Sequence, residues 1–282
     1  MQLVTEVPPR ADIGVFGGSG LYSLLDDAEE VALDTRWGRP SAPITIGEIA
    51  GARVAFLPRH GTRHQLPPHR VDYRANVAAM RELGVGALFA PFAAGSVQPT
   101  IHPGELVVVD QFVDRTSGRI ETFHDDFADG PRHVSVADPY DEHLRMLLCT
   151  AGRAEGFIVH EHGTVVVVNG PRFSTRAESD WFRQMGWHVV NMTQHPEAVL
   201  AREAGLTYAG LALVTDYDAG VAGRPDVEPV SQELVFELFE QNIDRLRALL
   251  RGAITRWVAD AADGPTRPAP RGPLLPTGSP AR

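Results

Sequence analysis

The sequence predicts a single α/β domain with a central mixed or parallel β-sheet flanked by helices. Apolar runs rich in β-branched residues recur along the chain and are too uniformly apolar for half-exposed strands, which indicates a sheet covered on both faces. Helical patterns lie between these runs, and that alternation is typical of α/β proteins. The 282 residues are an ordinary length for one such domain.

The expected elements follow one another along most of the chain. Strands are expected at residues 13–16, 53–57, 87–92, 106–110, 164–168, 188–191 and 207–215. Helices are expected at residues 71–83, 141–153, 175–185, 196–204 and 232–258. Thr175 and Glu178 have the spacing of a capping box, and Trp181, Phe182 and Met185 follow at helical intervals.

Residues 1–260 are expected to form the domain and residues 261–282 a Pro/Gly-rich tail. From about Asp263 the sequence reads DGPTRPAPRGPLLPTGSPAR, a composition that cannot form a packed core by itself. The one apolar stretch of the tail, Leu274-Leu275-Pro276, fits either docking onto a neighbouring surface or simple disorder.

Charge and cysteine content exclude several classes of protein. With 26 Lys and Arg against 36 Asp and Glu, the net charge is −10, which argues against a nucleic-acid or anionic-membrane surface. Cys149 is the one cysteine, so no disulfide framework is expected. The N-terminus lacks the pattern of a signal peptide, and no run of about 18 apolar residues occurs. We therefore expect a soluble cytoplasmic protein.

Two segments at strand ends offer hydrogen-bond donors. Gly17-Gly18-Ser19-Gly20 is either a tight turn or a loop whose backbone N–H groups and Ser19 hydroxyl face a ligand, and it matches no dinucleotide or Walker motif. Residues 58–64, PRHGTRH, form a dense cationic cluster. Arginine grips phosphate or carboxylate bidentately and histidine adds a donor, so the cluster predicts an anion site, with a solvated loop as the alternative. No third ligand accompanies His60 and His64 at a recognisable spacing, so no metal site is predicted.

Two further segments end strands with polar residues. In the segment 191–197, NMTQHPE, Thr193 offers a hydroxyl to the same anion, and Glu197 is expected to interact with the helix dipole. Asp216 and Asp218 follow the strand at 207–215 and form either an Asx-type turn or a polar reader of a ligand. Buried carboxylates close together raise each other's pKa, so one of the pair is suited to donate a proton.

Taken together and in this order, these segments resemble the trimeric purine nucleoside phosphorylases, in the branch of the 5′-methylthioadenosine phosphorylases. The matching text is IGVFGGSGLY, LPRHG with VDYRAN, AAGS, DQFVDRTSGR, NGPRFSTRAES, VVNMT with PEAVLAREAGL, and ALVTDYD. The resemblance extends to about residue 258, and the motifs are jointly highly specific.

The resemblance implies phosphorolysis, in which inorganic phosphate attacks C1′ of the sugar while the base departs. The products from 5′-methylthioadenosine are adenine and 5-methylthioribose 1-phosphate, a step of purine and methionine salvage. The resemblance also implies a homotrimer. Phosphate is a co-substrate, and neither a metal nor an organic cofactor is implied. A protonated Asp near N7 of the purine would contribute ~10²–10⁴-fold as a general acid.

The resemblance also assigns site residues by position. The implied phosphate site consists of Ser19, Arg59, His60, Thr193 and the backbone of Ala93. The implied nucleoside site consists of Met192, Phe173, His64, Val235 and Phe236, with Asp216 and Asp218 as readers of the purine edge and as the catalytic acid pair. His133 and Leu274 match positions that in this family reach into the 5′ pocket of a neighbouring subunit.

Two Asp residues favour a 6-aminopurine, because a carboxylate accepts from the exocyclic amino group and a protonated carboxyl donates to N7. A mismatched buried polar pair costs about 1–3 kcal/mol. Two positions depart from the family pattern: Phe92 stands where a small hydroxyl residue is frequent, and Gln232 stands where an apolar residue is expected. Gln232 either bonds a 5′-hydroxyl, which would admit adenosine, or points to solvent.

Four alternative functions are weighed against this reading. A phosphorylase of adenosine or of 6-oxopurine nucleosides (inosine, guanosine or methylthioinosine) is the nearest, and the acidic pair disfavours the 6-oxopurines. A nucleoside hydrolase would not need a phosphate site at Arg59 and His60. A dinucleotide-binding oxidoreductase is disfavoured because G-x-G-x-x-G is missing. A catalytically silent nucleoside-binding protein would bind without turnover.

Overall fold

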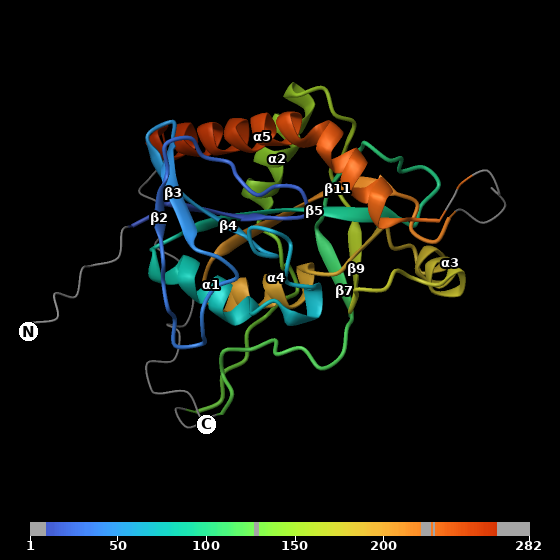
Figure 1. Ribbon diagram of the computed structural model, residues 1–282, viewed down its shortest axis with the longest axis horizontal. Helices are drawn as coiled ribbons and strands as arrows, with labels where there is room; N and C mark the ends of the chain where they lie inside the picture. The colour runs from blue at the N-terminus through green and yellow to red at the C-terminus, as the bar shows by residue number, and fades with distance from the viewer. Residues whose placement is uncertain (1–9, 127–129, 221–226, 228, 264–282) are drawn as a thin grey trace, which may run out of the picture.

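The computed structural model describes residues 10–126, 130–220, 227 and 229–263. Within these residues, eleven strands form one mixed sheet, and five α-helices surround it (Figure 1). The strands are β1 (Ile13–Gly17), β2 (Glu29–Val31), β3 (Ile44–Ile49), β4 (Ala52–Pro58), β5 (Ala87–Ser96), β6 (Leu106–Val108), β7 (Gln111–Arg115), β8 (Val159–His160), β9 (Thr164–Val168), β10 (Val189–Asn191) and β11 (Thr207–Asp216). The helices are α1 (Tyr73–Glu82), α2 (Glu142–Ala154), α3 (Arg176–Gln184), α4 (Gln194–Glu203) and α5 (Gln232–Asp263), and a short 3₁₀ helix spans Pro68–Arg70.

Strand β5 lies at the centre of the sheet and pairs with three other strands, β1, β10 and β11. Along one edge its first residues pair in parallel with β1, and its last residues pair antiparallel with β10. Its other edge pairs in parallel with β11 over almost its whole length. The sheet continues beyond β1 through β4, β3 and β2, beyond β10 through β9 and β7, and beyond β11 through β6 and β8. The parallel and antiparallel pairs together make the sheet mixed, as the sequence predicts.

Helices cover both faces of the sheet. Helices α1 and α4 pack on one face, and α2 and α5 pack on the other (Figure 1). One buried cluster contains Met80, Leu88 and Leu200, and the other contains Leu148 and Leu249. Every residue of β1 is buried, as expected for a strand between two layers of helices. This burial explains why the central strands are recognisable as continuous apolar runs.

The expected strands and helices are all present, with shifted ends. Strand β5 extends to Ser96 and β6 ends at Val108, whereas the expected strands ended at residues 92 and 110. The capping box of Thr175 and Glu178 is confirmed, because both of its reciprocal hydrogen bonds are present. The sequence analysis missed β2, β3, β7 and β8. These strands lie toward the margins of the sheet, are short or partly exposed, and owe their extended form to a paired neighbour rather than to an apolar run.

Parallel pairing brings several loops to one edge of the sheet. Strands β1, β4, β5 and β11 run in the same direction, so their carboxyl ends open at the same side. Strand β10 arrives antiparallel to β5 and ends beside Ala93, where the Asn191 side-chain amide donates to the Ala93 carbonyl at 3.2 Å. The four segments singled out in the sequence therefore meet at one place.

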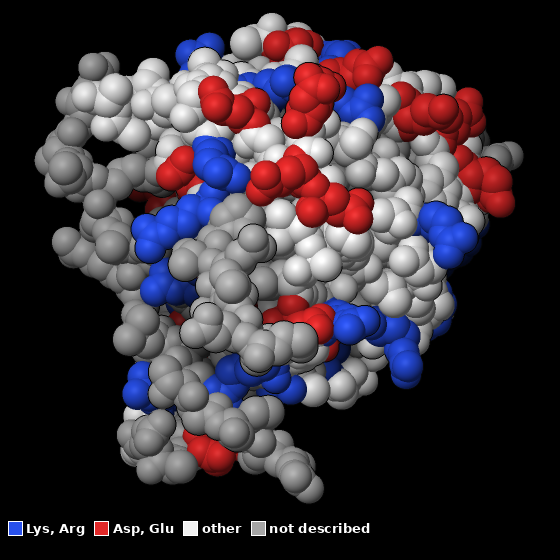
Figure 2. All heavy atoms as spheres, turned by 60° about the vertical axis from the view of Figure 1, so that its left-hand side comes forward, with Lys and Arg blue, Asp and Glu red and all other residues white. Residues whose placement is uncertain are grey.

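On the described part of the face shown in Figure 2, acidic and basic side chains are interspersed. None of the helices in the described ranges is both long enough and apolar enough to cross a lipid bilayer. Residues 264–282 lie outside the described residues, so the predicted boundary between domain and tail stays a prediction.

Candidate active site

A pocket of about 600 Å³ opens at the carboxyl edge of the sheet. This volume is in the range of cavities that enclose small organic ligands. Its walls come from the ends of β1, β4, β5, β10 and β11 and from the start of α5.

Most of the residues that the sequence analysis selected lie in this pocket. The selected residues that line it are Ser19, Arg59, His60, His64, Phe92, Ala93, Phe173, Met192, Thr193, Asp216, Asp218, Gln232, Val235 and Phe236. His133 is exposed and is not among the lining residues. Leu274 lies outside the described residues.

The glycine loop after β1 is both a turn and a wall of the pocket. The Leu21 amide donates to the Gly18 carbonyl at 3.1 Å, which closes the turn. A Cβ added at Gly17 would lie 2.2 Å from the Leu21 carbonyl oxygen, and one at Gly18 would lie 2.7 Å from the Pro91 carbonyl oxygen. Only glycine permits this close approach. The loop therefore passes directly beside the Arg59 guanidinium, whose Nη1 lies 3.4 Å from the Gly18 Cβ position.

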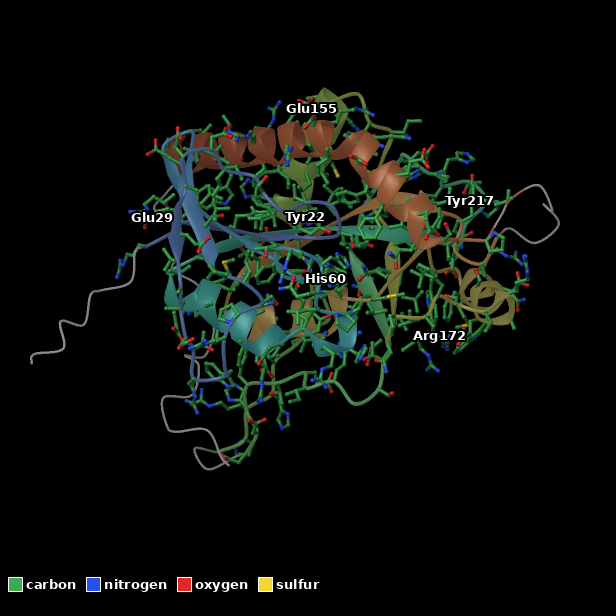
Figure 3. The ribbon with its side chains drawn as sticks, in the orientation of Figure 1. Tyr22, Glu29, His60, Glu155, Arg172 and Tyr217 are labelled. Carbon is green, nitrogen blue, oxygen red and sulfur yellow. The ribbon has the colours of Figure 1, made fainter. Side chains whose placement is uncertain are left out.

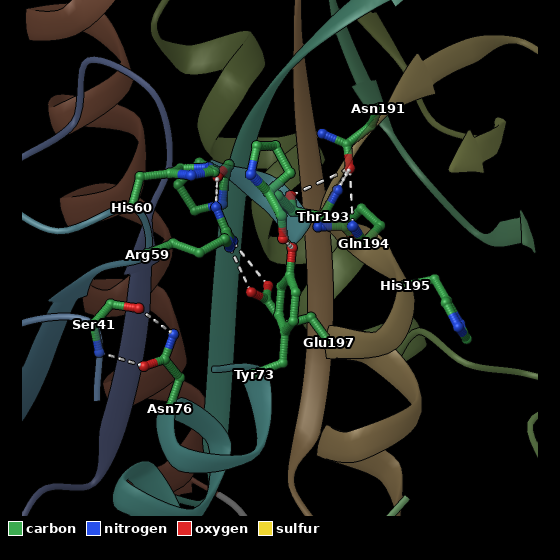
Figure 4. Close-up of polar contacts among 12 residues, drawn as sticks. Ser41, Arg59, His60, Tyr73, Asn76, Asn191, Thr193, Gln194, His195 and Glu197 are labelled. Carbon is green, nitrogen blue, oxygen red and sulfur yellow. Dashed lines mark hydrogen bonds and ion pairs between the residues drawn. The ribbon is translucent and has the colours of Figure 1, made fainter. Parts of the chain in front are cut away.

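Arg59 is buried at the base of the pocket and is paired with Glu197 (Figure 4). Its Nε and Nη2 donate to the two Glu197 oxygens at 2.5 and 2.8 Å, and the Tyr208 hydroxyl donates to the same carboxylate at 2.7 Å. The side chains of Arg59 and Glu197 are 0% and 1% exposed. Burial alone would lower the pKa of Arg59, but the Glu197 carboxylate outweighs it, and the pKa is raised. The sequence analysis assigned Glu197 to the helix dipole, whereas the structure makes it the counter-ion of Arg59.

His60 is a neutral acceptor rather than the donor that the sequence analysis expected. Its Nδ1 lies 2.8 Å from the Leu66 carbonyl oxygen, which can only accept, so Nδ1 carries the proton. Burial, reinforced by the charge of Arg59, lowers the pKa of His60 to about 3. Nε2 is then left with a lone pair. Burial also lowers the pKa of His64, whose ring stacks on that of His60 at 4.5 Å.

Asn191 organises the turn that presents Thr193 to the pocket. Its Oδ1 accepts from the backbone amides of Thr193 and Gln194 at 2.6 and 2.9 Å, while its Nδ2 reaches Ala93 on β5 (Figure 4). One side chain thereby ties the two implied phosphate contacts, Ala93 and Thr193, to each other. The sequence analysis gave Asn191 no role, although asparagine two residues before Thr193 is a recognisable turn signal.

The two carboxylates of the acidic pair have different surroundings. Asp216 uses both oxygens internally: Oδ2 accepts from the Thr215 hydroxyl and Oδ1 from the Asp218 amide, each at 2.7 Å. The Asp218 carboxyl accepts hydrogen bonds from Ser174 and Ser179, which lower its pKa against the larger effect of burial, while its Oδ2 atom is buried without a well-aligned partner in the described part of the chain. Asp218 also has a φ of 47°, an uncommon backbone conformation for a residue with a side chain. The turn interpretation is confirmed for Asp216, whereas the reading of a ligand by Asp218 stays a prediction.

Burial raises the pKa of both carboxyls, that of Asp216 to about 6. Gly95 on β5 makes room for them, because a Cβ there would lie 2.7 Å from Asp216 Oδ1 and 3.1 Å from the Asp218 Cα. The sequence analysis did not identify Gly95 as necessary for the acidic pair. The sequence shows that Gly95 belongs to the AAGS motif, but it does not show which side chains approach Gly95 in the folded protein.

The opposite end of the pocket is more apolar. The Phe236 ring meets the His64 ring edge-on at 5.5 Å, and the Tyr22 hydroxyl lies 3.2 Å from His64 Nδ1. Figure 3 shows Tyr22 and His60 near the middle of the molecule, with Arg172 and Tyr217 toward the α3 end. Gln232, at the start of α5, is exposed and lines the pocket, which is compatible with both of its predicted roles.

None of these lining residues belongs to a three-residue group of His, Cys, Asp and Glu that could hold a metal ion, as far as the described chain extends. One such group occurs elsewhere in the described residues. It consists of Asp114, Glu121 and His195, and none of these lines the pocket.

Comparison with known proteins agrees with this geometry. Residues 12–256 match the model of the phosphorylase superfamily. The chain belongs to the phosphorylase superfamily. This superfamily member is 52% identical over 251 residues to a protein of Streptomyces coelicolor named purine nucleoside phosphorylase, covering 87% of this chain and 89% of the relative. It is also 52% identical over 250 residues to the S-methyl-5′-thioadenosine phosphorylase of Mycobacterium tuberculosis, covering 88% and 90% of the two chains.

Solved structures of the same superfamily share the fold. A variant of the adenosine/methylthioadenosine phosphorylase of Schistosoma mansoni, in complex with methylthioadenosine, superposes with a TM-score of 0.82 at 36% identity. The match covers 90% of this chain and 94% of that one. The fold expected from the resemblance, a nucleoside phosphorylase domain, is confirmed.

We predict that Glu197→Gln destabilises the protein by about 3–5 kcal/mol, because it leaves the Arg59 charge buried without a counter-ion. The free energy of unfolding, measured by urea denaturation, tests this. Glu161→Gln is the control, since Glu161 pairs with Arg153 at the surface and should matter little. Equal effects of the two substitutions would contradict the assigned role of Glu197.

We also predict a pH dependence that originates from Asp216. Its folded-state pKa of about 6 lies above the ordinary value, so its contribution to stability is complete below about pH 4 and is lost as the pH rises through 6. With ~1.4 kcal/mol per pKa unit, the loss is on the order of 3 kcal/mol. Asp216→Asn should flatten the fall in unfolding free energy between pH 4 and 7, whereas Asp244→Asn, which removes an exposed carboxylate, should retain it. An unchanged slope in the Asp216 variant would contradict the assignment.

Proposed function

We propose that this chain catalyses the phosphate-dependent, reversible cleavage of the N-glycosidic bond of 5′-methylthioadenosine to adenine and 5-methylthioribose 1-phosphate. One observation carries the proposal: a single pocket joins an anion-binding end, built around Arg59 and Thr193, to a buried acidic end at Asp218. Phosphorolysis needs both ends, since phosphate attacks C1′ while a proton donor helps the base to leave.

The proposed phosphate site would bind the anion through hydrogen-bond donors rather than through a large positive net charge. Arg59 Nη1 faces the glycine loop, and Ser19, the Ala93 backbone and Thr193 surround the same space. His60, with its Nε2 lone pair, suits the P–OH proton of HPO₄²⁻, so it would select a protonated phosphate and orient it. Phe92 lines this end where a hydroxyl residue is frequent in the family, so this chain relies on the remaining donors.

At the purine end, Asp218 Oδ2 is the proposed proton donor to N7. The C1′–N9 bond breaks with its electron pair going to the purine, and a proton from Asp218 neutralises the developing negative charge. Burial favours the protonated form by raising the pKa of Asp218. Phe173 and Met192 would cover the ring and the ribose. Asp216 holds the turn, and a remaining lone pair of its carboxyl oxygens would accept from the 6-amino group.

At the 5′ end, His64, Val235 and Phe236 provide a largely apolar wall for a methylthio group. Gln232 lies at the same wall and offers a hydrogen bond to a 5′-hydroxyl. Adenosine is therefore the second candidate substrate, and the relatives bear both kinds of name: purine nucleoside phosphorylase and S-methyl-5′-thioadenosine phosphorylase.

The proposal extends to a homotrimer in the cytoplasm that serves purine and methionine salvage without a metal or organic cofactor. His133 and Leu274 would then complete the 5′ pocket of a neighbouring subunit. In support, His133 is exposed and lies away from the pocket of its own chain, as a residue that serves a neighbour should.

The first experiment measures base release from methylthioadenosine, adenosine and inosine, each with and without phosphate. We expect phosphate-dependent cleavage of methylthioadenosine above the other two. Equal cleavage of adenosine would assign Gln232 the role of a 5′-hydroxyl reader. Preferred cleavage of inosine would contradict the 6-aminopurine assignment, and cleavage without phosphate would contradict phosphorolysis.

A second prediction concerns the proton donor. Asp218→Asn keeps the shape of the side chain but removes the acid, so kcat/KM for methylthioadenosine should fall by ~10²–10⁴-fold. Any activity on inosine should fall less, because the introduced side-chain amide can donate a hydrogen bond to the 6-oxo group of that purine. Asp244→Asn is the control for loss of a carboxylate far from the pocket. A kcat/KM within a few-fold of the parent protein would exclude Asp218 as the acid.

A further inference from the structure

A second polar cluster lies outside the pocket, beside the start of α4. It consists of Asp114 near the end of β7, Glu121 in the following loop, and His195. His195 Nε2 lies 3.2 Å from Glu121 Oε2 and 3.5 Å from Asp114 Oδ2, and the three ligand atoms all lie within 4.8 Å of one another. We propose that these three side chains bind a divalent transition-metal ion of the Zn²⁺ type.

Two of the three interatomic distances suit metal coordination better than a short hydrogen bond, and the third is at most 4.8 Å. Ligands that lie ~2.0–2.2 Å from a tetrahedral Zn²⁺ stand roughly 3.3–3.6 Å from one another. The two distances from His195 Nε2 are close to that separation, whereas a charge-assisted N–H···O bond is about 2.7–2.9 Å long. One imidazole with two carboxylates is also a donor set that such ions accept.

The orientation of His195 gives a second argument. Its side chain is only 4% exposed, it is directed away from the Arg59–Glu197 pair in Figure 4, and Nε2 faces both carboxylates. A neutral ring has at most one N–H and cannot serve two oxygens well. Nδ1 is buried without a hydrogen-bond partner in the described chain, so it is an unsatisfied donor in one tautomer and an unsatisfied acceptor in the other.

A hydrogen-bonded imidazole is the competing arrangement. His195 Nε2 has one position for a proton, so at most one of the two carboxylates can accept from it. The other carboxylate then faces the ring nitrogen without a proton of its own, an arrangement that a dication would stabilise.

The cluster is open on one side. Asp114 and Glu121 are 36% and 59% exposed, so an ion can enter and retain water in its remaining positions. A bound ion would join β7 and its following loop to the start of α4, where the Arg119 guanidinium already donates to the His195 carbonyl. Because Thr193 lies two residues before His195, the ion would brace the turn that lines the pocket without touching substrate.

The test uses the full, untagged chain, stripped with a chelator and titrated with Co²⁺, whose visible absorption reports coordination. We expect one Co²⁺ per chain, displaced by Zn²⁺, and a rise of roughly 5 °C in melting temperature with Zn²⁺ at about 100 times its Kd. Glu121→Gln should weaken Co²⁺ binding by about 100-fold. Loss of a residue that only hydrogen-bonds a metal ligand typically costs about 10–100-fold in affinity, and loss of a ligand itself should reach at least the upper end of that range. His195→Gln should abolish it.

Glu121→Gln alters an exposed side chain and keeps the proposal testable if the buried His195 variant fails to fold. His143→Gln is the matched control, because His143 pairs with a single carboxylate, Asp260, at the surface and should leave the Co²⁺ affinity unchanged. No Co²⁺ absorption in the parent chain would overturn the proposal. The same affinity in the parent and in Glu121→Gln would overturn it as well.

Discussion

The buried pair of Arg59 and Glu197 is the interaction on which the rest of the site depends. A guanidinium with no solvent exposure can stay charged only beside an anion, and Glu197 supplies it through two hydrogen bonds. The pair joins the end of β4 to α4, and Tyr208 of β11 joins it from a third element. The base of the pocket is therefore held by charges whose separation would be costly.

This pairing neutralises the buried arginine of the pocket, while Arg63, which also lines the pocket, is exposed. Arg59 is neutralised by Glu197, and His60 is uncharged, so the anion-binding end consists mainly of directed donors. Such a site recognises an anion by geometry, because N–H groups and hydroxyls are fixed in advance by the glycine loop and by Asn191. At the other end, burial raises the pKa of both carboxyls, which favours the protonated form that the proposed reaction needs from Asp218.

The residues that form the pocket and those that support it were not equally visible in the sequence. Glycine, Arg-His and Asp-x-Asp segments at strand ends could be selected as ligand-binding positions, since parallel strands bring their carboxyl ends together. Glu197, Tyr208, Asn191 and Gly95 could not be given their roles. Glu197 pairs with a residue 138 positions away, and Asn191 reaches a residue 98 positions away in addition to its local turn. Gly95 faces the acidic pair of another strand. Tyr208 meets Glu197 only because both are buried beside Arg59. The marginal strands were missed for the same reason, because a neighbouring strand and not their own composition keeps them extended.

The sequence by itself determined the α/β class, the order of the buried strands and helices, the capping box at Thr175 and most residues that line the pocket. These features depend on local patterns: apolar periodicity, turn residues and motif spacing. Only the tertiary structure decided the protonation of His60, the partner of Arg59, the unequal roles of Asp216 and Asp218, and the cluster around His195. Those properties depend on burial and on contacts between distant segments, since a pKa or a ligand set is a property of the groups that folding places around an atom.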